Sequence, residues 1–126
     1  MATKNTPLQT KSKIWIEDKD GNVVFGTGRL RILKAIKQHG SINSAARALK
    51  MGYRAVWARI TATEKRLGQK LLIRKSGGAS GGGSQLTPLA ETLLSHYENV
   101  QNYIEQVTDE TFKDVLGKNL NICNSH

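Results

Sequence analysis

Glycines at the ends of apolar, helix-periodic stretches are the strongest constraint on this chain of 126 residues. Apolar residues recur every third or fourth position before Gly40 and again before Gly68. Glycine is favoured just past the end of a helix because it adopts the left-handed backbone conformation at little cost. Ser41 is a good N-cap for a short helix in between, and Met51–Gly52 breaks the periodicity. The sequence therefore predicts three consecutive helices, at 27–39, 42–50 and 53–67.

A β-hairpin is predicted before these helices. Residues 13–26 read KIWIEDKDGNVVFG, with apolar runs at 14–16 and 23–25 on either side of a polar centre. Asp-Gly-Asn at 20–22 supplies residues that accept the positive φ angles of a tight turn. Because two strands alone are only marginally stable, we expect this hairpin to pack on another element.

Residues 77–84 hold five glycines and two serines. Such a run is compatible with a flexible linker, a phosphate-binding loop of an enzyme, or the tip of a hairpin. No Lys-Ser or Lys-Thr follows the last glycine, as the phosphate-binding loop requires, and a linker would separate two independent cores. The flanking segments 71–75 and 84–87 read instead as short strands, and Pro88 opens a helix directly afterwards. We therefore predict a wing, a hairpin with its tip at 76–84.

The last predicted helix, 88–107, carries apolar residues at alternating steps of four and three, which is the pattern of a coiled-coil seam. The seam residues are Leu86, Ala90, Leu93, Tyr97, Val100, Ile104 and Val107. Packing on the domain's own core would account for the seam as far as Leu93. Because the seam is longer than the rest of so small a domain covers, we favour a helix from a second copy and predict a homodimer.

Basic residues are concentrated in the middle of the chain. Residues 29–75 contain thirteen Lys or Arg against a single acid, Glu64, whereas residues 76–126 have a net charge of −4 and the whole chain +9. A merely solvated surface usually has both signs of charge interspersed. The concentration is typical of a surface that binds a polyanion, and double-stranded DNA is the expected partner.

The sequence offers little for catalysis or metal binding. Cys123 is the only cysteine, and His39, His96 and His126 share no metal-ligand spacing. It shows no nucleophile with a paired base, no pair of carboxylates and no apolar run long enough to span a bilayer. We expect a cytoplasmic, nucleoid-associated protein that is not an enzyme and uses neither metal nor cofactor.

The second and third predicted helices have the spacing of a helix-turn-helix unit, in which the later helix enters a DNA major groove. A core face is predicted on that helix at Val56, Ile60 and Leu67, with Trp57 at its edge, where packing in the core is favoured over a stacking role. The opposite face holds Arg54, Ala55, Ala58, Thr61, Ala62 and Lys65. Three alanines allow close approach to base edges, and Arg54 can donate two hydrogen bonds to guanine.

We predict three groups of DNA contacts. Base contacts from the recognition helix are predicted at Tyr53, Arg54, Ala55, Ala58 and Arg59. Phosphate contacts around the second helix are predicted at Ser41, Asn43, Ser44, Arg47 and Lys50. Wing contacts are predicted at Arg74, Lys75, Ser76, Gly77, Gly78, Ser80, Gly81, Gly82 and Ser84.

The segment 40–94 resembles the N-terminal DNA-binding domain of ModE-type, molybdate-responsive transcriptional regulators, which are winged helix-turn-helix modules related to the LysR type. The most specific pieces are Tyr-Arg-Ala-Val-Trp at 53–57 with Ile60, and the glycine-rich wing followed by Leu-Thr. The likeness extends over residues 14–107. It implies a dimeric repressor or activator that binds a two-fold symmetric operator.

Two departures from that family matter. Its members continue into oxyanion-binding β-barrel domains, whereas nineteen residues follow Val107 here. We therefore do not expect this chain alone to bind molybdate, and the sequence names no other small-molecule effector. Gly52 stands where the family commonly has Ser, which removes a possible hydroxyl contact to phosphate.

The sequence thus predicts a mainly α-helical fold with small β elements: a winged helix-turn-helix, an N-terminal β-hairpin and a long C-terminal dimerisation helix. We expect a flexible N-terminus at 1–12, the DNA-binding domain at 13–87, the dimerisation helix at 88–107 and a tail at 108–126. In the tail, docking on the partner subunit is expected of Phe112, Val115 and Leu116. The expected function is sequence-specific transcriptional regulation. The alternative is an architectural or non-specific nucleic-acid-binding protein, against which Arg54 on an alanine-rich face argues.

Overall fold

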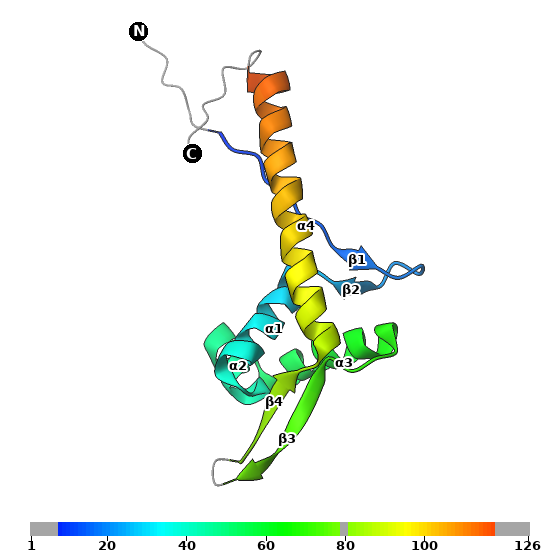
Figure 1. The fold of residues 1–126 in the computed structure, drawn as a ribbon, viewed down its shortest axis with the longest axis vertical. Coiled ribbons are helices and arrows are strands. Elements are labelled where there is room, and N and C mark those ends of the chain that lie inside the picture. The colour runs from blue at the N-terminus through cyan, green and yellow to red at the C-terminus, as the bar shows by residue number, and fades with distance from the viewer. Residues whose placement is uncertain (1–7, 79–80, 118–126) are drawn as a thin grey trace. The chain divides into compact units, whose positions relative to one another are not determined.

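The computed structural model describes residues 8–78 and 81–117, without the side chains of 76–78, 81–82 and 117, and its fold is mainly α-helical with two small β-hairpins (Figure 1). The elements are β1 (Ile16–Glu17), β2 (Val23–Phe25), α1 (Thr27–His39), α2 (Ile42–Leu49), α3 (Tyr53–Leu67), β3 (Leu72–Gly78), β4 (Gly81–Leu86), α4 (Pro88–Phe112) and a π-helical turn (Lys113–Gly117). The chain forms two compact units. One is Ile14–Tyr97, and the other comprises, among the described residues, 8–13 and 98–117.

The core of the unit Ile14–Tyr97 lies where α1, α2 and α3 meet, and the first turns of α4 contribute to it. Its buried residues are Val24, Phe25, Ile32, Leu33, Ala35, Ile36, Ile42, Ala45, Ala46, Val56, Ile60, Leu71, Leu86, Ala90, Leu94 and Tyr97. Each large apolar side chain buried here contributes about 1.5–3 kcal/mol to folding. The apolar residues that recur along α1 and α2 thus face this core, with Leu30 and Leu49 half-buried against it.

Helix ends follow the predicted signals. Gly40 and Gly68 close α1 and α3 with φ angles of 82° and 69°. Ser41 caps α2, its Oγ accepting a hydrogen bond of 3.0 Å from the Ser44 amide. Lys50 takes a left-handed conformation, with φ 57°, so α2 ends one residue earlier than predicted.

The first hairpin is built around Asp18. Its carboxylate accepts hydrogen bonds from the amides of Asp20 and Asn22, at 2.9 and 3.0 Å, and Gly21 supplies the left-handed residue of the turn. Hydrogen bonding by Asn22 lowers the pKa of Asp18. As expected, the hairpin packs on another element, because the Thr63 hydroxyl on α3 donates to the carbonyl of Val24 at 2.8 Å.

The second hairpin is longer than predicted, since the glycines themselves pair as strand. The register runs from Leu72 opposite Leu86 to Gly78 opposite Gly81, with an irregularity after Lys75. Its strand β4 lies against the turn between α1 and α2, where the Ser84 amide donates to the carbonyl of Gly40 at 2.8 Å. At Gly83, a Cβ would lie 2.7 Å from that same carbonyl oxygen, so only glycine fits.

The structure corrects the predicted seam at three positions. Leu86 lies in β4, as the predicted strand at 84–87 required, and Leu86, Ala90 and Tyr97 are 5%, 0% and 4% exposed in the chain's own core. The Tyr97 ring meets Phe25 edge-on at 5.3 Å, and its hydroxyl donates to the carbonyl of Ile14 at 2.7 Å. These three side chains are therefore not available to a second subunit, because the core of one copy already covers them.

The second unit pairs the C-terminal part of α4 with residues 8–13, which have no regular secondary structure. The Gln101 side chain donates to the carbonyl of Ser12 at 2.9 Å, and the Thr10 hydroxyl donates to the carboxylate of Asp109. Helix α4 continues five residues past the predicted boundary at 107. Parts of the predicted flexible N-terminus and tail, 1–7 and 118–126, lie outside the described residues.

Replacing Gly83 by Ala should lower the free energy of unfolding by about 1–3 kcal/mol, because the added methyl group forces two backbones apart. Thermal unfolding followed by circular dichroism measures the change. The matched control is Gly28→Ala, since Gly28 lies in the first turn of α1 with nothing within 4 Å of an added Cβ. That control should be neutral or stabilising by up to about 1 kcal/mol. Equal melting temperatures for Gly83→Ala and the wild type would contradict the close approach.

Candidate nucleic-acid interface

Helices α2 and α3 form a helix-turn-helix. The turn is held by backbone hydrogen bonds, from Lys50 N to Arg47 O at 3.1 Å and from Met51 N to Ala46 O at 2.9 Å. Helix α3 then starts at Tyr53 behind an extended Gly52 that makes no side-chain cap. Helix α2 packs on α3, and Tyr53 and Arg54 in the first turn of α3 remain exposed to solvent.

Helix α3 has two faces, as predicted. Val56, Ile60 and Thr63 are buried, and Leu67 is half-buried. The exposed residues of the helix are Tyr53, Arg54, Trp57, Ala58, Arg59, Lys65 and Arg66, while Ala55, Thr61 and Ala62 are half-buried. The predicted base-contacting residues therefore share the N-terminal half of one helix, with four of the five exposed and Ala55 half-buried.

Trp57 is not the core residue that its sequence position suggested. Its side chain is 45% exposed, and Thr63 takes the core position on the opposite edge of the buried stripe. A threonine fits there because its hydroxyl donates to Val24 O at 2.8 Å and accepts from Arg29 Nε at 3.2 Å. Thr63 was assigned no role from the sequence. Its position three residues after Ile60 places it on the buried face of the helix, and this was the signal that could have identified it.

Glu64, the one acid among residues 29–75, has hydrogen-bond partners, whereas most of the thirteen cations of this segment have none among the described residues. Glu64 Oε2 accepts hydrogen bonds from the amides of Leu71 and Leu72, at 2.8 and 3.3 Å, and Lys70 Nζ lies 3.9 Å from Oε1. Within the described part of the chain, no hydrogen bond or ion pair engages the side chains of Arg47, Lys50, Arg54, Arg59, Lys65, Arg74 or Lys75. The positive charge of this face is therefore left unneutralised.

Two further arginines have a structural role. Arg29 on α1 donates to the Thr63 hydroxyl and so ties α1 to α3, whereas Arg66 on α3 donates to the carbonyl of Val23 and ties the first hairpin to α3. Burial, followed by the nearby charges of Arg66 and Arg59, lowers the pKa of Arg29. An arginine nevertheless stays charged in proteins, so this side chain adds to the positive field.

The predicted phosphate contacts lie at the start and along the outside of α2. Asn43, Arg47 and Lys50 are exposed, and Ser41 and Ser44 are half-buried. The Ser41 oxygen already accepts from the Ser44 amide, which leaves its hydroxyl proton available to an acceptor.

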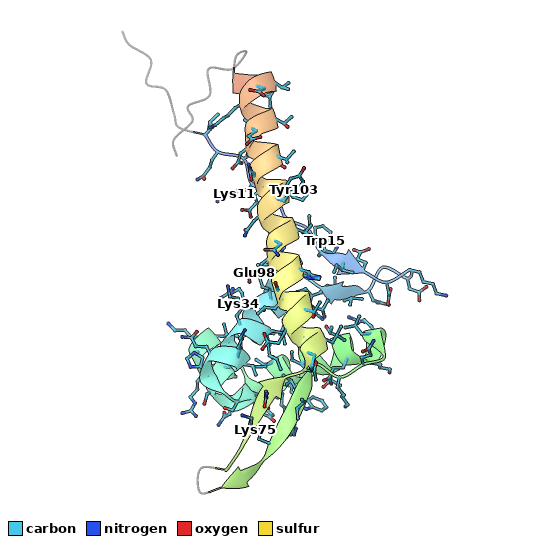
Figure 2. The ribbon with its side chains drawn as sticks, in the orientation of Figure 1. Lys11, Trp15, Lys34, Lys75, Glu98 and Tyr103 are labelled. Carbon is cyan, nitrogen blue, oxygen red and sulfur yellow. The ribbon has the colours of Figure 1, made fainter. Side chains whose placement is uncertain are left out.

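The predicted wing is the β3–β4 hairpin. Arg74 and Lys75 are exposed on β3, and Figure 2 shows Lys75 on this hairpin. Ser84 is half-buried, and its backbone amide is bound to Gly40. Ser80 lies outside the described residues, and only backbone is described for Ser76, Gly77, Gly78, Gly81 and Gly82.

The order of elements, a helix-turn-helix followed directly by a β-hairpin, is that of a known protein family. The model of the bacterial regulatory helix-turn-helix proteins of the lysR family matches residues 27–91. The chain belongs to this family. The match begins with α1 and ends in the first turn of α4, so it contains the helix-turn-helix and the wing.

Relatives of known role resemble parts of this LysR-family chain, which confirms the likeness to ModE-type regulators. It is 46% identical over 70 residues to the transcriptional regulator ModE of Haemophilus influenzae, a match to 56% of this chain and 28% of the relative. It is 31% identical over 103 residues to the molybdenum transport protein ModE of Azotobacter vinelandii, covering 79% of this chain and 38% of the relative. The chain thus spans less than two fifths of either relative.

Solved structures show the same fold. The crystal structure of the CbnR_DBD–DNA complex superimposes with a TM-score of 0.53 at 21% identity, covering 67% of this chain and 91% of the other. The BenM_DBD/benA site 1 DNA complex gives 0.52 at 22% identity, covering 70% and 96%. The predicted winged helix-turn-helix fold is confirmed.

Residues 8–78 and 81–117 contain neither a membrane-spanning helix nor a cluster of metal ligands. No helix there is long and apolar enough to cross a membrane. Nor do three or more His, Cys, Asp or Glu side chains gather in that part of the chain as they would around a metal ion.

Replacing Glu64 by Ala should destabilise the protein by about 2 kcal/mol, because two backbone amides between α3 and β3 lose a charged acceptor. Glu64→Gln, which keeps a carbonyl oxygen, should cost less. Lys70→Ala is the control for the ion pair: Lys70 is 82% exposed, so its loss should change stability by no more than about 0.5 kcal/mol. Urea unfolding of the three variants measures these differences. A larger effect for Lys70→Ala than for Glu64→Ala would assign the stabilisation to the ion pair.

Proposed function

We propose that this chain is the DNA-binding part of a sequence-specific transcriptional regulator that acts as a homodimer in the cytoplasm, at the nucleoid. The observation that carries the proposal is the open N-terminal half of α3, where Arg54 is exposed and unpaired among the described residues and Ala58 leaves room beside it. The relatives named above include a transcriptional regulator, and two of the structural neighbours are DNA complexes.

In this proposal α3 lies in the major groove. Arg54 sits one residue from the start of the helix, where recognition helices approach base edges, and its guanidinium can donate to O6 and N7 of guanine. Ala58 lies one turn further along the same face and lets the helix approach closely. Tyr53 and Arg59 flank this pair and add contacts to bases or phosphates.

Phosphates on either side of the groove would be bound by α2 and the wing. Asn43 and Arg47 on α2 and the Ser41 hydroxyl would contact one strand. Arg74 and Lys75 on β3 would contact the backbone on the other side of α3. Such contacts orient the protein on DNA and carry no sequence information of their own.

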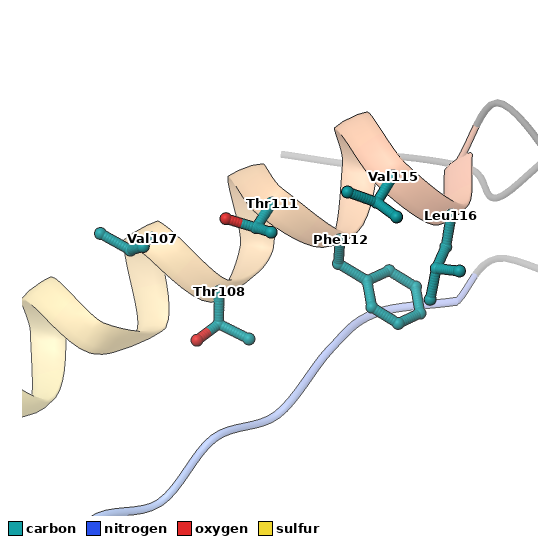
Figure 3. Close-up of a pocket in the computed structure, with 6 residues that line it drawn as sticks. All are labelled: Val107, Thr108, Thr111, Phe112, Val115 and Leu116. Atoms are coloured by element: carbon teal, nitrogen blue, oxygen red, sulfur yellow. The ribbon is translucent and has the colours of Figure 1, made fainter.

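The C-terminal part of α4 would bind a second copy. Val100, Tyr103 and Val107 are 50%, 64% and 39% exposed, and Ile104 between them is half-buried. Near the end of the helix, Val107, Thr108, Thr111, Phe112, Val115 and Leu116 line an apolar cavity of about 420 Å³ (Figure 3). Figure 3 shows Phe112 and Leu116 projecting from the same side of the helix end. A second copy would cover these apolar side chains and set the spacing of two half-sites.

Molybdate sensing is not part of the proposal for this chain. The family match covers the helix-turn-helix and the wing, and the proposal concerns these two elements. Repression and activation are equally compatible with the surface described. A role as an enzyme finds no support among the relatives named.

Arg54→Ala tests sequence-specific binding. A random-pool selection with the full chain should yield a palindrome with half-sites about 10–10.5 bp apart, or a small multiple of that. On the selected duplex, Arg54→Ala should cost about 1–3 kcal/mol and relax the preference at one base pair of each half-site. Arg31→Ala removes the same charge from the exposed side of α1 and is the control. Equal losses on selected and scrambled DNA would favour the architectural alternative.

The double variant Val100→Glu with Val107→Glu should be monomeric, because four buried carboxylates would face each other across a two-fold interface. Sedimentation velocity measures the association state, and the variant should also lose affinity for the two-half-site duplex. Asn102→Glu adds a charge on the opposite side of the helix and should remain dimeric. A dimeric Val100→Glu/Val107→Glu variant would locate the interface elsewhere.

A further inference from the structure

A cleft between the recognition helix and the wing is not explained by the contacts proposed so far. It has a volume of about 400 Å³, and its walls include Ile42, Trp57, Thr61, Lys70, Leu72 and Arg74. These residues come from the start of α2, from α3 and from β3 with the segment before it. The cleft thus lies where the helix-turn-helix and the wing adjoin, beside the exposed face of α3.

The cleft combines an apolar wall with a cationic rim. Trp57 is 45% exposed beside Ile42 and Leu72, while Lys70 and Arg74 supply positive charge. The carboxylate of Glu64 also borders the space, but it is engaged by the amides of Leu71 and Leu72. A ligand that suits such walls has an apolar ring joined to an anion.

The indole of Trp57 is also chemically available. Among the residues that the structure describes, neither the indole N–H of Trp57 nor the guanidinium of Arg74 has a hydrogen-bond partner. Covering a large aromatic side chain that is half exposed on a basic surface lowers the free energy of the complex with the partner that covers it. Both groups line the same cleft and are free to bind one ligand.

We propose that this cleft seats one nucleotide of the DNA backbone, with its deoxyribose ring on the Trp57 indole and its phosphate bound by Arg74. The inference rests on the proposed function and deepens it. Lys70 adds to the positive potential at the rim of the cleft. Because Trp57 contacts the deoxyribose, it binds DNA without contacting a base. The nucleotide is held between α3 and β3, so it links recognition helix and wing on one strand.

Binding measurements on the full chain test this assignment. Trp57→Ala should weaken binding to the selected duplex and to a scrambled duplex by the same factor, about 5- to 30-fold. Trp57→Phe, which keeps an apolar ring but lacks the N–H, should recover most of that loss. Trp15→Ala is the matched control, because Trp15 is 51% exposed on the first hairpin and should not affect binding. Melting temperatures confirm that each variant is folded.

Salt dependence separates the two halves of the site. Arg74→Gln should reduce the slope of log affinity against log salt by about 0.9, whereas Trp57→Ala should leave the slope unchanged. The double variant should lose less than the product of the two single losses, since both side chains hold one nucleotide. A methylphosphonate scan should find one phosphate whose neutralisation weakens the wild type but not Arg74→Gln.

Several results would overturn the assignment. Unchanged affinity of Trp57→Ala would leave the cleft without a DNA ligand, and a relaxed preference at a single base pair would make Trp57 a base reader instead. Independent losses for Trp57→Ala and Arg74→Gln would place them on different nucleotides. If Trp57→Ala does not fold, Trp57→Phe and Arg74→Gln still test the shared phosphate. A wild type that binds no duplex at all would contradict the proposed function itself.

Discussion

The contact between β4 and the α1–α2 turn is the constraint on which the proposed DNA-binding surface depends. Ser84 donates to the carbonyl of Gly40, and Gly83 passes so close to that carbonyl that no side chain fits. The same turn ends α1 and presents Ser41, the cap of α2. One backbone contact therefore fixes the base of the hairpin relative to both helices that precede the recognition helix.

The positive charge of the proposed DNA-binding surface depends on the position of Glu64. Glu64 is the one acid among residues 29–75, and its carboxylate serves the backbone at the junction of α3 and β3. It stabilises the turn that brings β3 back along α3, and its charge is screened from solvent by Lys70 and burial, since only 14% of its side chain is exposed. The same residue thus orders the wing and leaves the surrounding arginines unneutralised, which is what a phosphate-binding surface requires.

Local signals predicted the helices well, and tertiary contacts account for what was missed. The positive φ angles at Gly40 and Gly68 and the cap at Ser41 are local, so their sequence signals were sufficient. Trp57 was misplaced because an edge position on a helix is decided by its neighbours, here Thr63, whose hydroxyl is satisfied only across the fold by Val24 and Arg29. The heptad pattern could not separate Tyr97, which meets the chain's own Phe25, from Val100, which is exposed. In the candidate site, the exposure of Arg54 could be predicted from helix periodicity. The cleft beside Trp57 could not, because it depends on the path of β3 past α3.

The arrangement separates affinity from specificity along one helix. Arg54 and Ala58 point away from the core on the open face of α3, where base edges can be read. Trp57, one position before Ala58 but turned by about 100° around the axis, borders the cleft toward β3. In the proposed binding mode, contacts on that flank are to the DNA backbone, so they would add affinity on every sequence and hold the helix at one depth in the groove. A recognition helix that is anchored in this way can discriminate between DNA sequences with few base contacts. The helix cannot shift to avoid a mismatched base pair at Arg54, so the mismatch keeps its full cost in binding free energy.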